Sequence, residues 1–87
     1  MLAEMLDQKV VVDLRSTFVC LGTLSRLDEQ FLELKNADLH DLRDTQTSRE
    51  NYVAAAWATG IKRNRKRVLV SRADLVAVSR LEDVVDE

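Results

Sequence analysis

The feature that most constrains the fold is the stretch from Lys9 to Asn36, where apolar residues recur at alternate positions. Val10, Val12 and Leu14 alternate with more polar neighbours at the start of this stretch. A period of two is typical of a half-buried β-strand, because successive side chains point to opposite faces. The stretch therefore predicts strands rather than helices as the framework of the chain.

Two polar breaks divide this stretch into three strands. Ser16-Thr17 forms the first break and Asp28-Glu29-Gln30 the second. Gly22 interrupts the middle run, and a glycine inside a strand usually marks a bend or a bulge. Asp28 is also suited to cap its turn through side-chain to backbone hydrogen bonds. The expected strands span residues 9–15, 18–27 and 30–36.

The character of the chain changes after a polar stretch, residues 38–49, which is the longest loop candidate, with Leu39 and Leu42 either prolonging the third strand or starting the loop. Residues 48–59 (SRENYVAAAWAT) are rich in alanine, a strong helix former. Thr47 and Glu50 have the spacing of a capping box, and Gly60 stands where a C-terminal cap belongs. We predict a helix here, with Tyr52 and Trp57 as packing residues.

Two more strands and a short N-terminal helix complete the expected elements. Residues 61–72 predict a strand that is charged at its start and apolar at its end, and a short strand follows from Leu75 to Val78. Residues 1–8 have one apolar face at helical spacing and predict a helix packed on the mouth or end of the sheet. We therefore predict a single domain over residues 1–87, mainly β, with a small, strongly bent, five-stranded antiparallel barrel. A helix is inserted between its third and fourth strands.

Composition narrows the classes of function. Cys20, the one cysteine, lies in an apolar strand and is expected to be buried. The absence of a disulfide framework, a signal peptide or a membrane span predicts an intracellular protein, cytoplasmic, or nuclear in a eukaryote. His40 is the lone histidine, expected to be solvated in a polar loop, and no ligand cluster indicates a metal. No catalytic motif is present, so we predict a protein that is not an enzyme and uses no cofactor.

The net charge of −2 hides an uneven distribution. Residues 62–67 (KRNRKR) carry five of the 13 basic side chains, and the last six residues (EDVVDE) carry four acids. The basic segment predicts either phosphate contacts or a solvated strand start that discourages wrong edge pairing. Its basic members are Lys62, Arg63, Arg65, Lys66 and Arg67.

Two stretches of the chain resemble the Sm/LSm family. The first is VVVDLRSTFVCLGTLSRLD, in which Gly22 and Asp28 have the spacing of the first Sm motif, followed by Leu32, Leu34 and Asn36. The second is VLVSRADLVAV, which resembles the second motif. The order of leading helix, motif, variable loop and motif agrees with that family as well.

The resemblance implies a base-binding pocket repeated around a ring of subunits. Its members here would be Gln30, Phe31 and Arg72, with Asp28 as the orienting carboxylate. The chain departs from the family at the base-reading asparagine, where Phe31 or Leu32 stands instead. Strand alternation points Phe31 away from the inward-facing leucines. An ion pair between Arg72 and Asp74 is the alternative for that arginine.

These observations predict a ring-forming Sm-like protein that binds single-stranded RNA or DNA as a scaffold or chaperone in RNA processing, within a ribonucleoprotein. The two free strand edges predict a homo-oligomeric ring, in which the fourth strand of one subunit pairs with the fifth of the next. The alternative is a protein of the same fold that serves as an oligomeric structural or protein-interaction module and has lost nucleic-acid binding. In that case the acidic tail and the Tyr52/Trp57 helix are partner surfaces.

Overall fold

The computed structural model of the protein describes residues 1–44 and 46–85. One antiparallel sheet of five strands, in the order β4-β3-β2-β1-β5, forms the framework, as predicted. The strands are β1 (Lys9–Leu14), β2 (Phe18–Leu27), β3 (Phe31–Asp41), β4 (Arg65–Ser71) and β5 (Leu75–Arg80). The helix α1 (Arg49–Thr59) lies between β3 and β4, and the 3-10 turns are η1 (Leu2–Met5), η2 (Leu42–Asp44), η3 (Arg72–Asp74) and η4 (Leu81–Asp83).

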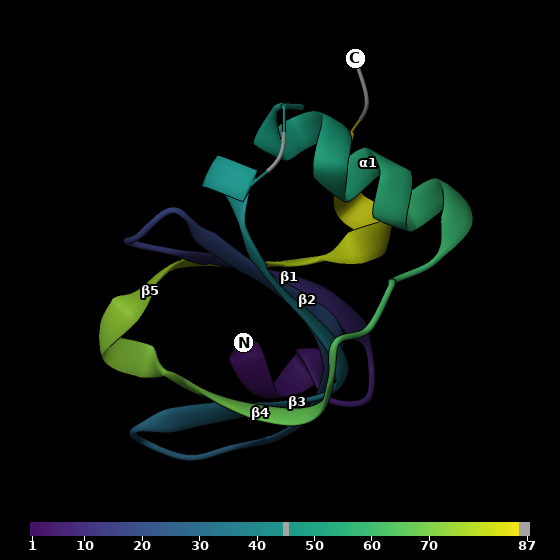
Figure 1. Cartoon of the computed structure of the whole chain (residues 1–87). Helices are drawn as coiled ribbons and strands as arrows, with labels where there is room; N and C mark the ends of the chain where they lie inside the picture. Colours follow the sequence, from purple (N-terminus) through teal and green to yellow (C-terminus); the bar gives the residue numbers. More distant parts are fainter. Residues whose placement is uncertain (45, 86–87) are drawn as a thin grey trace.

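The sheet bends sharply along the paired strands β2 and β3, and it curls into an open barrel (Figure 1). The pairing of Leu21 with Asp38 shifts by one residue before Thr23 pairs with Lys35, so β3 bulges opposite Gly22. A Cβ placed on Gly22 would lie 3.1 Å from the Cβ of Ala37 and 3.1 Å from the Lys35 carbonyl oxygen. Only glycine allows this approach without displacing β3, which confirms the predicted bend.

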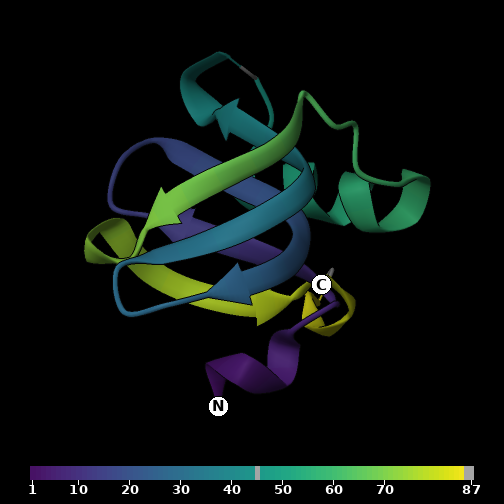
Figure 2. The same cartoon turned by 90° about the horizontal axis from the view of Figure 1, so that it is seen from below.

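An inner core fills the inside of the bent sheet. Its buried members come from β1, β2, β3 and β4: Val10, Val12, Cys20, Leu24, Leu32, Leu34, Ala37 and Val70. Leu2 and Met5 of η1 pack against this cluster, so the N-terminal turn closes the mouth of the barrel (Figure 2). The helix predicted over residues 1–8 is therefore in the expected place, although it is a single 3-10 turn.

A second, outer core lies on the other face of β1 and β2, beneath α1 (Figure 1). Val11, Val19 and Leu21 point away from the barrel interior and pack against Val53 and Ala56 of α1. Leu81 of η4 joins the same cluster and is 2% exposed. Both faces of β1 and β2 are therefore buried, whereas alternation alone predicts one buried face.

The ends of α1 are capped by its own sequence. Ser48 is the N-cap, and its Oγ accepts a hydrogen bond from the Asn51 N–H at 3.2 Å, one residue later than the cap predicted at Thr47. Gly60 ends the helix with φ 94°, and its N–H donates to the Ala56 carbonyl at 2.9 Å. The predicted glycine cap is thus confirmed, because this positive φ suits a residue without Cβ.

A polar network fixes α1 over the sheet. The Tyr52 hydroxyl donates to Oδ2 of Asp38, a buried carboxylate of β3. Asn64 donates to the other oxygen, Oδ1, at 3.1 Å. Burial first, and then the Asp38 carboxylate, raise the pKa of Tyr52. The phenol therefore remains a donor, and it satisfies a carboxylate that would be costly to bury alone.

Three expectations about the middle of the chain were wrong. β3 continues to Asp41, so the first four residues of the loop predicted over residues 38–49 are strand, because β2 from Phe18 onward pairs with them. His40 therefore lies in a strand, and its ring stacks on Tyr52 with centroids 4.0 Å apart. The strand predicted over residues 61–72 begins only at Arg65, because the preceding residues connect α1 to the sheet.

Cys20 is fully buried in the inner core, as expected. Burial, reinforced by the Asp38 carboxylate, raises the pKa of Cys20 to about 12, so the thiol stays protonated. Within residues 1–44 and 46–85, no helix has the length and apolarity needed to cross a membrane. The last two residues of the acidic tail, Asp86 and Glu87, lie outside the described residues.

Candidate nucleic-acid interface

The turn between β2 and β3 is organised by the side chain of Asp28. Its Oδ1 accepts hydrogen bonds from the backbone N–H groups of Gln30 and Phe31, each at 2.8 Å. The bond from Gln30, and next the one from Phe31, lower the pKa of Asp28, so its carboxylate is ionised at neutral pH. Asp28 thus caps the turn, as its position after a strand predicted, and the residue is exposed.

Arg72 ties this turn to η3, which connects the two edge strands. Its Nη1 donates to the carbonyl oxygen of Asp28 at 2.5 Å, and its backbone N–H donates to the Gln30 carbonyl at 2.8 Å. The guanidinium therefore binds the turn in place of an ion pair with Asp74. The structure brings together Asp28, Gln30, Phe31 and Arg72 from loops more than 40 residues apart in sequence.

Phe31 stands between two shallow hollows at this end of the sheet. Its side chain is 38% exposed, whereas the next residue, Leu32, is fully buried in the inner core. One hollow, of about 480 Å³, is lined by Glu29, Gln30, Phe31, Ser71, Arg72 and Ala73. The other, of about 230 Å³, is lined by Arg26, Leu27, Asp28, Phe31, Glu33 and Leu69. The predicted outward orientation of Phe31 is confirmed.

The second hollow contains residues that the sequence did not single out. Arg26 and Glu33 face each other across β2 and β3, and Arg26 Nη2 lies 3.0 Å from Glu33 Oε2. Ser25 Oγ donates to Glu33 Oε1 at 2.7 Å, and this bond, ahead of the one from Arg26, lowers the pKa of Glu33. The signal was available: once the turn at Asp28 is placed, counting outward along the hairpin brings positions 26 and 33 together.

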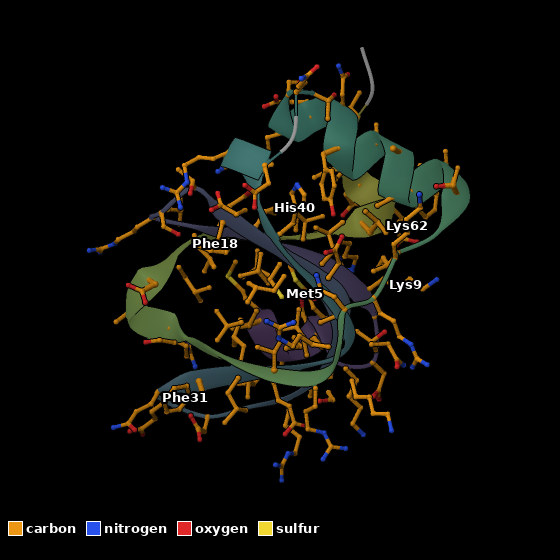
Figure 3. All side chains as sticks on the ribbon, in the orientation of Figure 1. Met5, Lys9, Phe18, Phe31, His40 and Lys62 are labelled. Carbon is orange, nitrogen blue, oxygen red and sulfur yellow. The ribbon has the colours of Figure 1, made fainter. Side chains whose placement is uncertain are left out.

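The basic segment lies at the opposite end of β4 from Arg72. Arg65 begins β4 and pairs with Ala37, whereas Ser71 ends β4 and pairs with Phe31. Lys62 lies near the end of α1, far across the molecule from Phe31 (Figure 3). The structure therefore separates the predicted phosphate contacts from the predicted base pocket.

The basic side chains differ in what they bind. Arg63 Nη1 donates to Asn36 Oδ1 at 2.6 Å, and Arg65 Nη1 donates to the carbonyl of its neighbour Asn64 at 3.1 Å. Arg67 Nε lies 3.7 Å from Glu33 Oε1, so of this segment it extends furthest toward the Phe31 hollow. Within the described part of the chain, Lys62 and Lys66 have no ion-pair partner.

The site offers three kinds of interaction to a ligand. The ring of Phe31 presents an exposed face on which a base can stack, an interaction that tolerates any base. Arg72 uses one donor on Asp28 and keeps others of its planar fork for a phosphate or a base carbonyl. The exposed amide of Gln30 carries both donors and an acceptor. Among the described residues, no three metal-binding side chains come together.

Comparison with known proteins supports the fold. No family model matches the sequence, and no curated protein matches it either. The structure is similar to that of the Sm protein of Pyrococcus abyssii, solved in complex with a uridine heptamer, with a TM-score of 0.61. That likeness covers 90% of this chain and 89% of the other at 17% sequence identity. The chain therefore has an Sm-like fold, which confirms the expected architecture.

Proposed function

We propose that this protein binds single-stranded RNA through the surface formed by Asp28, Gln30, Phe31 and Arg72. The observation that carries the proposal is the convergence of an exposed aromatic ring and a guanidinium at two adjoining loops of an Sm-like sheet. The structurally similar Pyrococcus protein was solved with a uridine heptamer, which supports RNA as the ligand class. The protein performs no chemistry in this role and acts as a scaffold or chaperone in RNA processing.

Each residue of the proposed site has a distinct part. Phe31 stacks on a base, and Arg72 contributes a cation and planar donors. Gln30 supplies the polar edge contact that an asparagine would otherwise provide. Asp28 positions the others, because its carboxylate holds the backbone of Gln30 and Phe31 and its carbonyl accepts from Arg72.

The proposal includes assembly into a ring. Both edge strands, β4 and β5, have one unpaired side, and each exposes a large apolar residue, Leu69 at 58% and Val76 at 65%. Pairing of β4 in one copy with β5 in the next would remove both edges and repeat the RNA site around the axis. Lys62, Arg63, Arg65, Lys66 and Arg67 would then lie around the ring, where a strand leaving the site would meet positive charge.

Fluorescence anisotropy with labelled oligo(U), oligo(A) and single-stranded DNA tests the proposal, first at low salt and then at increasing salt. We expect binding to oligo(U) that weakens as salt rises, because phosphate contacts release counterions. Phe31→Ala should weaken binding about 5- to 100-fold, the range for loss of one stacked base. Arg72→Ala should weaken it as well, and Arg72→Lys should recover only the part due to charge.

Glu4→Ala is the matched control, because Glu4 is an exposed residue of η1 outside the proposed site. Its affinity should equal that of the wild type. Absence of binding to any of the three oligonucleotides at low salt would contradict the proposal.

The alternative, an oligomeric interaction module without nucleic-acid binding, is favoured by one observation. Leu32, one of the two residues that stand where the resemblance places a base-reading asparagine, is fully buried. Under this alternative a protein partner is lost on Trp57→Ala, while no oligonucleotide binds to any variant. The anisotropy titrations above therefore decide between the two functions.

A further inference from the structure

We infer that Arg65, at the start of β4 in one copy, binds a hollow between α1 and the end of β5 in the neighbouring copy. The hollow, of about 310 Å³, is lined by Gln8, Lys9, Trp57, Arg80, Leu81 and Glu82. It lies apart from the proposed RNA site. The inference rests on the ring of the proposed function and assigns one side of its interface a specific side-chain contact.

The direction of the strands brings these two regions together. If the RNA sites surround a common axis, η3 of each copy points toward that axis. β4 then runs toward the axis and ends at Ser71, whereas β5 leaves it from Leu75. Adjacent edge strands of two copies are therefore antiparallel, and in an antiparallel pair the start of one strand lies beside the end of the other. Arg65 of one copy consequently meets the region after Arg80 of the next.

The hollow carries two groups suited to a cation. Trp57 is 55% exposed on α1, although an indole is among the side chains that gain most from burial. Glu82 lies in η4, two residues after the end of β5, and within the described residues it has no ion-pair partner. An indole face and a carboxylate together favour a guanidinium or an ammonium group.

The other charges of the hollow are compatible with this contact. Arg80 is already engaged, because its Nε donates to Gln8 Oε1 at 2.5 Å and its Nη1 lies 3.9 Å from Asp83 Oδ2. The positive charge of Lys9 is then offset by the negative charge of Glu82, so an incoming cation meets a hollow without excess positive charge.

The Arg65 side chain is free to make the contact. Arg65 is exposed, and by strand alternation it shares the outer face of β4 with Arg67 and Leu69. It has no ion-pair partner among the described residues, and within them its side chain donates a hydrogen bond only to the carbonyl oxygen of the adjacent Asn64. The contact lies at the rim of the strand pair, so it orients and strengthens the interface while the edge strands provide its main hydrogen bonds.

The single tryptophan of the chain provides the experiment, because its emission reports on this hollow alone. Wild-type protein is diluted over a wide concentration range, with assembly measured by sedimentation velocity and Trp57 emission measured in parallel. We expect emission to shift to shorter wavelength as the assembly forms, since the partner covers the indole. An assembled protein whose emission is unchanged from that of the monomer would overturn the inference.

Charge exchange tests the pairing directly. Glu82→Lys alone, and Arg65→Glu alone, should each raise the concentration at half-assembly by about tenfold. The combination of the two substitutions should restore assembly to within a few-fold of wild type. Glu4→Lys, the same charge change outside the hollow, should have no effect. Wild-type assembly by Glu82→Lys, or no recovery in the combined variant, contradicts the contact.

Failure of this contact is distinguishable from failure of the proposed function. Arg72→Ala should lose oligo(U) affinity and retain both assembly and the emission shift. A protein that binds oligo(U) but assembles equally well with and without the charge exchange retains the proposed function and lacks this contact. A protein that stays monomeric at every concentration lacks both the ring and the contact.

Discussion

The outer face of the sheet is built differently on its two halves. Over β1 and β2 it is apolar, with Val11, Val19 and Leu21 buried beneath α1. Over β4 and the first half of β3 no helix of the described residues covers it, and it presents Phe31, Glu33 and Leu69 instead. The covered half adds a second core, whereas the uncovered half holds charge pairs and the proposed RNA site. The proposed RNA site thus lies where the described part of the chain adds no second layer to the sheet.

The two halves also differ in what holds them together. Beneath α1 the contacts are apolar packing plus one buried carboxylate, Asp38, satisfied by Tyr52 and Asn64. On the uncovered half, Glu33 is buried by its surroundings, yet its partners Arg26 and Arg67 are largely exposed. Exposed partners contribute little through ion pairing. Stability should therefore depend more on the covered half.

The largest expected effect is on the covered half. Leu21→Ala should lower the free energy of unfolding by about 2–5 kcal/mol, because it leaves a cavity between the sheet and α1. Leu69→Ala, the matched leucine on the uncovered half, should change it by less than about 0.5 kcal/mol. Urea denaturation of both variants at a concentration where the protein is monomeric measures the difference. Equal losses would contradict the comparison.

Tyr52→Phe should have the next largest effect. The substitution keeps the ring stacked on His40 but removes the donor to the buried Asp38 carboxylate. Leaving a buried acceptor short of a donor costs about 1–3 kcal/mol, measured by the same denaturation experiment. Tyr52→Phe combined with Asp38→Asn should cost less than the sum of the two single changes, because the pair acts as a unit. Strict additivity would show that the two residues are uncoupled.

Ser48→Ala should destabilise α1, the helix that covers β1 and β2. Loss of the N-cap hydrogen bond to Asn51 should cost about 1 kcal/mol. Hydrogen exchange should accelerate in α1 and leave β3 and β4 unchanged, because the helix can open locally. Ser48→Asp is the control, since it keeps an acceptor and adds a negative charge at the helix N-terminus. Uniform acceleration throughout the chain would mean that α1 unfolds only with the sheet.

The smallest expected effect is the pH dependence of stability that Glu33 contributes on the uncovered half. Glu33 has a lowered pKa in the folded protein, caused first by the hydrogen bond from Ser25 and next by that from Arg26. Its stabilising contribution is therefore present above the ordinary glutamate pKa of about 4.3 and is lost as pH falls through the lowered value. Between pH 6 and pH 3, Glu33→Gln should lose less stability than the wild type in urea titrations. Identical losses would exclude this contribution.

The two halves of the sheet also differ in how much of their core could be predicted from the sequence. Alternation at Val10, Val12 and Leu34 correctly predicted the inner core, because one face of a bent sheet must be apolar. The unbroken apolar runs Val10-Val11-Val12 and Val19-Cys20-Leu21 carried a further signal. Such runs indicate a strand buried on both faces, and here α1 supplies the second cover.

The features of the candidate site also divide into those that the sequence predicted and those that it did not. The turn at Asp28 and the outward orientation of Phe31 followed from local rules of turns and strand parity. The separation of the basic segment from Arg72 did not, because it depends on which end of β4 adjoins the β2–β3 turn. For the extension of β3 to Asp41, the local pattern left a longer strand and a loop as alternatives, since a polar segment becomes a strand only when a neighbour pairs with it.

The number and order of the strands, the bend at Gly22, the alanine-rich helix and the turn at Asp28 could be predicted from the sequence. These features depend on the conformational preferences and periodicity of residues close together in the chain. The folded structure was needed to show that α1 covers β1 and β2, that Tyr52 satisfies Asp38, and that Arg72 binds the Asp28 carbonyl. Those outcomes join residues 14 and 44 positions apart. They depend on how the whole sheet bends, which no local pattern records.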